Sequence, residues 1–173
     1  MIDESALVGG RERREIAIVD YDAAWPARFE HERARIASAL GPRALRIEHI
    51  GSTSVPGLAA KPIVDVLVTV ADPEDDELVS ALQDAGYELR VREPGHRMVR
   101  TPARDVHVHV RAAGDPEVER LLRFRQRLRA CAADRVEYEQ FKRELSQRDW
   151  ADMNEYAEAK SPLIESILAR AQR

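Results

Sequence analysis

Cysteine is almost absent from the chain, which contains only Cys131 among its 173 residues. A single thiol cannot form an internal disulfide, so nothing in the sequence indicates an oxidising compartment. The sequence also has no Cys-x-x-Cys pair and no cysteine–histidine spacing typical of a zinc finger. A disulfide-stabilised scaffold and a cysteine-based structural zinc site are therefore excluded.

Long apolar runs and an excess of basic residues are also missing. No apolar run approaches the roughly 20 residues that a membrane-spanning helix needs, and residues 1–15 lack the apolar centre of a signal peptide. The formal net charge is -4 and the sequence pI is about 5.8, whereas a dedicated nucleic-acid-binding domain is normally strongly basic. We therefore expect a cytoplasmic protein that does not enter membranes and whose main partner is not a nucleic acid.

The length and composition fit one globular domain, because 44% of the residues are hydrophobic and 34% are charged. Residues 1–14 predict a flexible tail, and residues 15–173 a single domain. Apolar patterns predict strands at 15–21, 44–50, 62–70, 87–93, 96–101 and 104–112, and helices at 22–40 and 73–86. Helical patterns follow from residue 115, at 135–147 and at 151–171, where Pro162 starts or kinks the last part. We expect an α/β (α+β) fold in which a helical part (115–173) packs on a sheet part (15–112).

The segment "EHIGSTSVPGLAAKPIVDVLVTV", residues 48–70, is unusually rich in turn residues. Gly51 lets the backbone approach a ligand closely, and the neighbouring hydroxyl and N–H groups can bind phosphate oxygens. Lys61 brings a cation to the start of the next strand, where Asp65 lies among valines. A buried carboxylate is unfavourable unless it is paired, hydrogen-bonded or bound to a metal. The alternative is an ordinary strand connection in which Asp65 pairs with Lys61.

Histidines alternate along the strand expected at 104–112. Asp105, His107 and His109 share one face by the two-residue period, while the intervening valines face the core. Two histidines near a carboxylate from a neighbouring strand make a plausible metal site, which His49 could join. Histidine nitrogens favour zinc or manganese over magnesium. The alternative is that these histidines are hydrogen-bonded residues on an exposed face of the sheet.

The stretch "IEHIGSTSVPGLAAKPIVDVLV" resembles the signature of the GrpB family, a group within the nucleotidyltransferase superfamily. "DYDAAWPARFEHE", "DVHVHV", "RFRQRLRA" and "NEYAEAKSPLIESIL" also resemble segments of that family, so the resemblance covers about residues 16–168. It implies a nucleotidyltransferase-like mixed sheet flanked by helices. Superfamily members carry a Gly-Ser turn, two alternating acidic residues on the next strand and a third on a neighbouring strand.

This sequence departs from that pattern at one position. Gly51 and Ser52 match the turn and Asp65 matches the first acidic position, but the second acidic position falls on Leu67, which binds no metal. His107 or His109 would replace the third carboxylate. The two-magnesium mechanism of the superfamily is therefore in doubt for this chain.

The resemblance implies metal-dependent transfer of a nucleotidyl group from a nucleoside triphosphate to an unknown acceptor, with Mg, Mn or Zn as the ion. Asp65 and His107 would be catalytic, and His49, Asp65, His107 and His109 would hold the metal. The residues expected to bind substrate are Gly51, Ser52, Thr53, Ser54, Lys61, Arg125 and Lys160. For Arg125 and Lys160 the alternative is a salt bridge that ties the helices to the sheet.

Two other readings of the function remain open. The chain could be a catalytically altered binding or folding-helper module, since similar domains occur fused to a kinase of coenzyme A biosynthesis. It could also be a metal-dependent phosphohydrolase that uses Asp65 and the histidines. The sequence predicts no particular oligomeric state.

Overall fold

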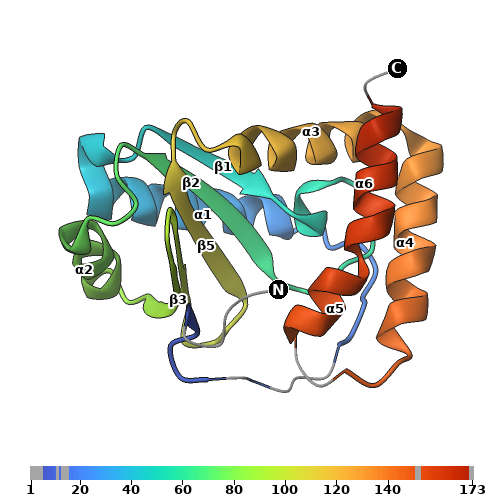
Figure 1. Cartoon of the computed structure of the whole chain (residues 1–173), viewed down its shortest axis with the longest axis horizontal. Coiled ribbons are helices and arrows are strands. Elements are labelled where there is room, and N and C mark those ends of the chain that lie inside the picture. The colour runs from blue at the N-terminus through green and yellow to red at the C-terminus, as the bar shows by residue number, and fades with distance from the viewer. Residues whose placement is uncertain (1–5, 11, 13–15, 151–152, 172–173) are drawn as a thin grey trace.

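The fold is built on a five-stranded mixed sheet. The computed structural model describes residues 6–10, 12, 16–150 and 153–171. The strands are β1 (Arg46–Ile50), β2 (Val64–Val70), β3 (Glu88–Glu93), β4 (His96–Arg100) and β5 (Val106–Ala112), and their order in the sheet is β1-β2-β5-β4-β3. β2 and β5 are parallel, and the other neighbours are antiparallel. This arrangement confirms the predicted α/β (α+β) class with a mixed sheet (Figure 1).

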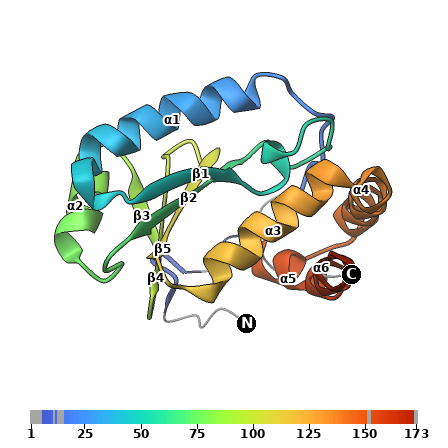
Figure 2. The ribbon, with the colours of Figure 1, turned by 90° about the horizontal axis from the view of Figure 1, so that it is seen from above.

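Helices cover both faces of the sheet. One face carries α1 (Trp25–Leu40) and α2 (Asp76–Asp84), and the other carries α3 (Pro116–Ala130). The helices α4 (Ala132–Ser146), α5 (Met153–Ala159) and α6 (Ser161–Arg170) gather beside α3, as Figure 2 shows from above. α5 and α6 correspond to the single stretch expected at 151–171, and Pro162 lies at the start of α6 as predicted. None of the described helices combines the length and the apolar character that crossing a membrane requires.

Short side chains fix where the helices begin. The carboxylate of Asp75 accepts a hydrogen bond from the Glu77 N–H at the start of α2, and Asp115 accepts one from Glu117 at the start of α3. Each satisfies a backbone donor that the first helical turn leaves without a partner. These caps explain why the chain turns from β5 directly into α3, which carries the helical part over the sheet.

The alternating residues of β2 and β5 separate two cores. The larger core lies under α1 and α2 and contains the valines of β2 and β5, for example Val66 and Val108. The smaller one lies under α3 and contains Ile50, Leu67, Val118 and Leu122. A third cluster joins α3, α4 and α6 to the β1–β2 connection; its buried members are Val55, Leu58, Leu128, Tyr138 and Ile167.

One expectation for the N-terminal part is wrong. The strand expected at 15–21 is, over its described residues, a single bridge between Val19 and Ala60. Ile16 and Ile18 pack against the helical part, on Leu145 and Tyr156, so the apolar run is buried by helices and not by strand pairing. Residue 15 lies outside the described part.

The expected loose tail also makes definite contacts where it is described. Leu7 bridges to Val91 of β3, and the Val8 N–H donates to the Arg90 carbonyl at 2.9 Å. Glu12 accepts two hydrogen bonds of 2.8 Å from Arg100, which lower the pKa of this carboxyl to about 2. Residues 6–10 and 12 are therefore attached to the sheet, and the rest of 1–14 lies outside the described part.

Candidate functional site

A glycine marks the point where β1 ends. Ile50 pairs with Asp65 across the antiparallel ladder, and Gly51 follows with φ +70°. A Cβ atom at Gly51 would lie 2.5 Å from Asp65 Oδ2, closer than any non-bonded contact allows. Only glycine fits both the left-handed backbone and the carboxylate beside it.

The three hydroxyl residues after Gly51 form the 3₁₀ turn Ser52–Ser54 and have different partners. Thr53 Oγ1 donates to the Ile63 carbonyl at 3.1 Å, and Ser54 Oγ donates to the Gly51 carbonyl at 2.6 Å. Both hydroxyls are therefore used to hold the turn. The hydroxyl of Ser52 instead receives a hydrogen bond of 3.0 Å from Lys142 Nζ.

Asp65 meets both histidines of β5. The parallel register places Asp65 beside His107, with Leu67 beside His109. Asp65 Oδ1 lies 3.6 Å from His107 Nδ1 and 3.6 Å from His109 Nε2, and one ligand atom from each residue lies within 4.8 Å of the others. Two ligands bound tetrahedrally to zinc are about 3.4 Å apart. The spacing of these three groups therefore fits one shared metal ion.

The ionisation of the cluster suits metal binding. Burial raises the pKa of Asp65, but His109, His107 and Lys61 outweigh burial and the net shift is downward. Burial lowers the pKa of His107 to about 4. At neutral pH Asp65 is therefore a carboxylate and His107 carries a lone pair, as metal ligands must.

A second histidine–carboxylate pair orients His109. The Glu93 carboxylate lies 2.9 Å from His96 Nδ1, and His96 Nε2 lies 3.3 Å from His109 Nδ1, with the two rings stacked. Because a carboxylate only accepts, the proton of neutral His96 lies on Nδ1, and its Nε2 accepts from His109 Nδ1–H. With Nδ1 engaged in this way, Nε2 is the nitrogen of His109 that remains for Asp65 or for a metal ion. From the sequence we did not expect His96 in the site. His96 and Met98 are two residues apart on β4 and share a face, and Met98 pairs with His109. This spacing could have indicated that His96 lies on the same face as His109.

All three lysines of the chain converge on this region. The 27 basic residues of the sequence include only Lys61, Lys142 and Lys160. Lys160 Nζ lies 4.6 Å and Lys61 Nζ 4.9 Å from the ring centre of Tyr156, and both influence Asp65 electrostatically. Lys142 Nζ donates to Ser52 and to the Ala59 carbonyl. The structure thus places Ser52, Lys61 and Lys160, three of the residues expected to bind substrate, in one region. Lys142 also lies there, although the sequence analysis did not select it.

Lys142 is 2% exposed. Burial, followed by the charge of Lys160, lowers its pKa to about 7, and burial lowers the pKa of Lys160 to about 8. Within the described residues neither of these two lysines forms an ion pair. Lys160 is partly exposed, whereas Lys142 is buried. A buried ammonium group without an opposite charge is unfavourable, so the surroundings of Lys142 favour a negatively charged ligand. In the sequence, Lys142 lies at helical spacing between Tyr138 and Leu145, on the side of α4 that is buried. A lysine at such a position could have indicated that it belongs to the site.

The hydroxyl of Tyr156 is another buried polar group in this region. It is buried and has no hydrogen-bond partner among the described residues. A buried polar atom without a partner is uncommon in folded proteins. Tyr156 is fully buried, and the ammonium groups of Lys61 and Lys160 lie over its ring.

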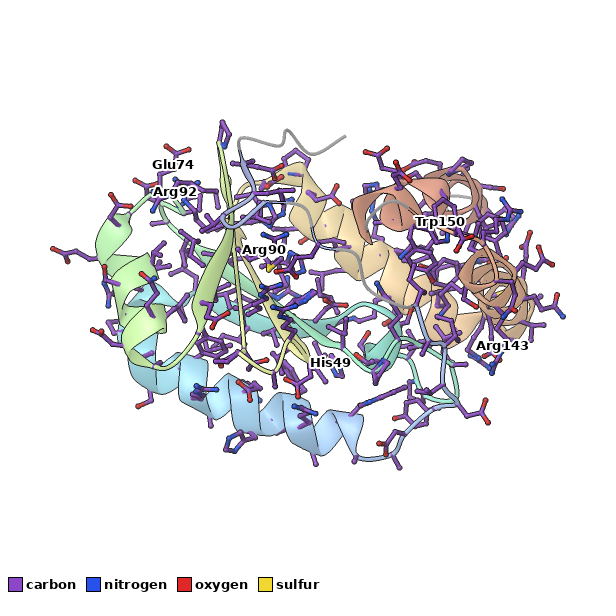
Figure 3. The ribbon with its side chains drawn as sticks, turned by 90° about the horizontal axis from the view of Figure 1, so that it is seen from below. His49, Glu74, Arg90, Arg92, Arg143 and Trp150 are labelled. Carbon is purple, nitrogen blue, oxygen red and sulfur yellow. The ribbon has the colours of Figure 1, made fainter. Side chains whose placement is uncertain are left out.

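Other predicted residues lie elsewhere. The ring of His49 (labelled in Figure 3) stacks on Phe29 of α1 at 4.8 Å, and its Nε2 lies 3.0 Å from Thr53 Oγ1. His49 pairs with Val66, so it is on the opposite face of the sheet from Asp65. Arg125 donates to Glu48 at 2.8 Å and to the His49 carbonyl at 2.7 Å. The structure therefore separates His49 from the other proposed metal ligands and gives Arg125 the alternative role, a salt bridge between α3 and β1.

Leu67 and Asp105 also have structural surroundings. Leu67 is fully buried under α3, against Val118 and Leu122. Asp105 precedes β5 and pairs with Arg28 and Thr101. The second acidic position of the superfamily is thus occupied here by a packed leucine, and Asp65, His107 and His109 are the residues that could hold a metal ion.

Comparisons with known proteins agree with the family resemblance of the sequence. The family described as "GrpB protein" matches residues 15–170. The UPF0157 protein SCO7215 of Streptomyces coelicolor is 55% identical over 95% of this chain and 89% of its own length. The crystal structure of the conserved protein GrpB from Enterococcus faecalis has a TM-score of 0.79 at 36% identity and covers 90% of this chain and 96% of that one.

A dephospho-CoA kinase from Mycolicibacterium paratuberculosis is also similar, with 31% identity over 92% of this chain but only 46% of the kinase. More than half of the kinase therefore lies outside the similar region. The family match covers almost the whole chain, and the fold and the Gly51–Asp65 turn lie within it. The chain belongs to the GrpB family.

Proposed function

We propose that the protein transfers a nucleotidyl group from a nucleoside triphosphate, with a divalent metal ion held by Asp65, His107 and His109. The observation that supports this proposal is the convergence of a carboxylate–histidine cluster with Ser52 and every lysine of the chain. A metal–triphosphate complex needs both kinds of group, oxygen and nitrogen ligands for the ion and cations for the phosphates.

The donor set has a preference among ions. One carboxylate and two imidazoles favour zinc or manganese over magnesium, which prefers oxygen ligands. A bound ion would polarise a phosphate oxygen and reduce repulsion of the attacking group. Lys160 would contact a remaining phosphate oxygen, because ammonium groups are strong donors to phosphate. Lys142 would act indirectly, by holding the Ser52 hydroxyl that faces the phosphates.

The transfer is a single displacement at phosphorus. The oxygen of an acceptor hydroxyl forms a bond to the α-phosphorus, the bond between that phosphorus and the bridging oxygen breaks, and pyrophosphate leaves with the electron pair. The hydroxyl proton passes to water. The residues named above align the triphosphate and balance the charge that develops.

Two alternatives make different products or none. A phosphohydrolase would use the same residues and release orthophosphate from its substrate. A binding module would bind ligand without turnover, and the related region in a dephospho-CoA kinase favours such an accessory role. Pyrophosphate, orthophosphate and the absence of both distinguish the three readings.

Calorimetric titration of each nucleoside triphosphate in the presence of Zn²⁺, Mn²⁺ or Mg²⁺ tests the proposal. We expect binding that requires metal and that Asp65→Asn weakens by about tenfold or more, because a neutral amide is a poor metal ligand. Asp84→Asn, at an exposed position of α2, is the matched control and should bind as the wild type does.

The outcome against the proposal is equally definite. Triphosphate binding that does not depend on metal, or that survives Asp65→Asn unchanged, contradicts the assigned site. Binding followed by orthophosphate release without pyrophosphate would replace transfer by hydrolysis.

A further inference from the structure

A groove of about 570 Å³ lies between α1 and α3 along the edge strand β1. Its lining includes Phe29 from α1, His49 from β1, Ser54 and Pro56 from the β1–β2 connection, and Arg129 from α3. None of Asp65, His107, His109, Lys142 and Lys160 lines it. The groove is therefore distinct from the carboxylate–histidine cluster, and Figure 2 shows the open side of β1 between the two helices.

One side of the groove is apolar, where Tyr21 is half-buried and Pro26 and Pro56 are exposed. The rings of Phe29 and His49 are stacked with an angle of 10° between their planes. Burial lowers the pKa of His49 to about 4, so its ring is neutral at pH 7. Tyr21 and Pro56 extend this surface. Such a wall favours a planar ring, which can stack without losing many rotatable bonds.

The groove also carries a positive charge, on α3, that remains after the ion pairs of its lining are formed. Arg125 pairs with Glu48, and Arg33 pairs with Glu30. Arg129 donates from Nε and Nη2 to the neutral Ser54 carbonyl, at 3.0 and 2.6 Å, and forms no ion pair within the described part of the chain. Its guanidinium is held in place by that carbonyl while its charge is left for another partner. A fixed guanidinium binds a carboxylate or phosphate with good geometry.

We propose that this groove is a second binding site, for a planar aromatic molecule that carries one anionic group. The ring packs on the apolar side, against Tyr21, Pro26 and Pro56, and the phosphate or carboxylate is bound by Arg129. The volume is large enough for a ligand of the size of a mononucleotide. A nucleoside monophosphate and an aromatic carboxylate share this chemistry, and direct binding distinguishes them.

The proposal does not depend on the proposed transferase activity. The groove needs no metal, and its ligand contacts none of the three residues that would hold the ion. Binding measured with a chelator present and in the Asp65→Asn protein therefore reports on the groove alone.

The test is calorimetric titration of the full chain, with EDTA present, by nucleoside monophosphates and by indole-3-carboxylate. Adenosine supplies a ring without the charge, and ribose 5-phosphate supplies the charge without the base. We expect one of the anionic ring compounds to bind with a Kd below about 1 mM, and adenosine and ribose 5-phosphate to bind at least about tenfold more weakly.

Three variants locate the site. Arg129→Gln should weaken binding about tenfold or more, because a charge-assisted hydrogen bond is lost. Arg123→Gln, an exposed position on the same helix, should leave it unchanged. Ala27→Trp, an exposed lining residue of α1, should fill the groove and abolish binding while the protein stays folded by circular dichroism.

Binding by monophosphates alone would identify a nucleotide site, and binding by the carboxylate alone an aromatic-acid site. The proposal is overturned if no anionic ring compound binds at a concentration of about 1 mM. It is also overturned if Arg129→Gln and Ala27→Trp both bind with wild-type affinity.

Discussion

At the scale of single residues, the site depends on groups that are unfavourable where they lie. Asp65, Lys142 and Lys160 are charged or partly charged groups within a sheet–helix interface. Arginine supplies almost all other cations of this chain. A lysine ammonium is compact and changes its pKa readily on burial, which an arginine guanidinium does not. The three lysines of the chain therefore lie where a cation with an adjustable pKa is useful.

The Glu93–His96–His109 relay gives a test at this scale. His96→Phe removes the acceptor that fixes the tautomer of His109, so we expect zinc or manganese affinity to fall about 10- to 100-fold. His96→Gln keeps an acceptor oxygen and should restore part of the affinity. Metal titration followed by calorimetry measures both.

His31→Phe is the control, because His31 is exposed on α1. Equal metal affinity in His96→Phe and His31→Phe would mean that the relay is a packing arrangement without influence on the cluster.

The residues of this site were only partly predictable from the sequence. The alternation of "DVHVHV" predicted that His107 and His109 share a face, and the register confirms it. His49 was grouped with them because it is near Gly51 in the sequence, but β1 directs it to the other face. Lys142 comes from a helix 90 residues after Ser52, and no local pattern specifies which turn of that helix meets the loop.

At the scale of elements, the connection from β1 to β2 controls the position of Asp65. Gly51 and Gly57 both have positive φ, at +70° and +77°. A Cβ at Gly57 would meet no atom within 4 Å, whereas one at Gly51 would collide with Asp65. The two glycines have the same backbone requirement and different surroundings.

Gly51→Ala and Gly57→Ala therefore form a matched pair. Both should lower the free energy of unfolding by about 1–2 kcal/mol, because alanine is strained in the left-handed region. Only Gly51→Ala should also weaken metal binding, since it displaces the carboxylate. Urea unfolding and metal titration separate the two effects, and equal metal affinity in the two variants would show that Asp65 moves without consequence.

Most elements followed from periodicity and capping residues, and residues 16–21 did not. Their apolar pattern resembles a strand, but Ile16 and Ile18 are buried by α4 and α5. Periodicity indicates that a segment will be buried and does not say by what. The same limit applies to Leu67, whose burial reflects α3 packing above β2.

At the scale of the whole molecule, the helical part completes the site that the sheet begins. Asp65, His107 and His109 belong to the sheet, while Lys142 and Lys160 come from the helices. Asp134 of α4 ties this part together by ion pairs to Arg127 of α3 and Arg170 of α6. Lys142 of α4 donates to Ser52 and to the Ala59 carbonyl in the β1–β2 connection, so packing of the helical part on the sheet part buries this ammonium group.

This link predicts how stability depends on pH. Lysine ionises near 10.5 in the unfolded chain, and the pKa of folded Lys142 is about 7. Between these values the unfolded state binds more protons, so stability rises with pH over this window and is lowest below pH 7. In Lys142→Met this contribution is removed.

The free energy of unfolding of the wild type minus that of Lys142→Met should therefore increase from pH 7 to pH 10. Urea unfolding at several pH values measures it, with Lys160→Met as a comparison whose window starts near pH 8. A difference that stays constant with pH would mean that Lys142 has an ordinary pKa.

The scarcity of lysine has a practical consequence for anyone who handles this protein. Reagents that couple dyes, cross-linkers or sensor surfaces to primary amines have three side chains to attack, and all three surround one site. Lys142 is buried, but Lys61 and Lys160 are partly exposed, and Lys160, with a pKa of about 8, is partly unprotonated near neutral pH and able to react. Routine amine labelling would therefore modify the very surface under study, and attachment through Cys131 is the safer route.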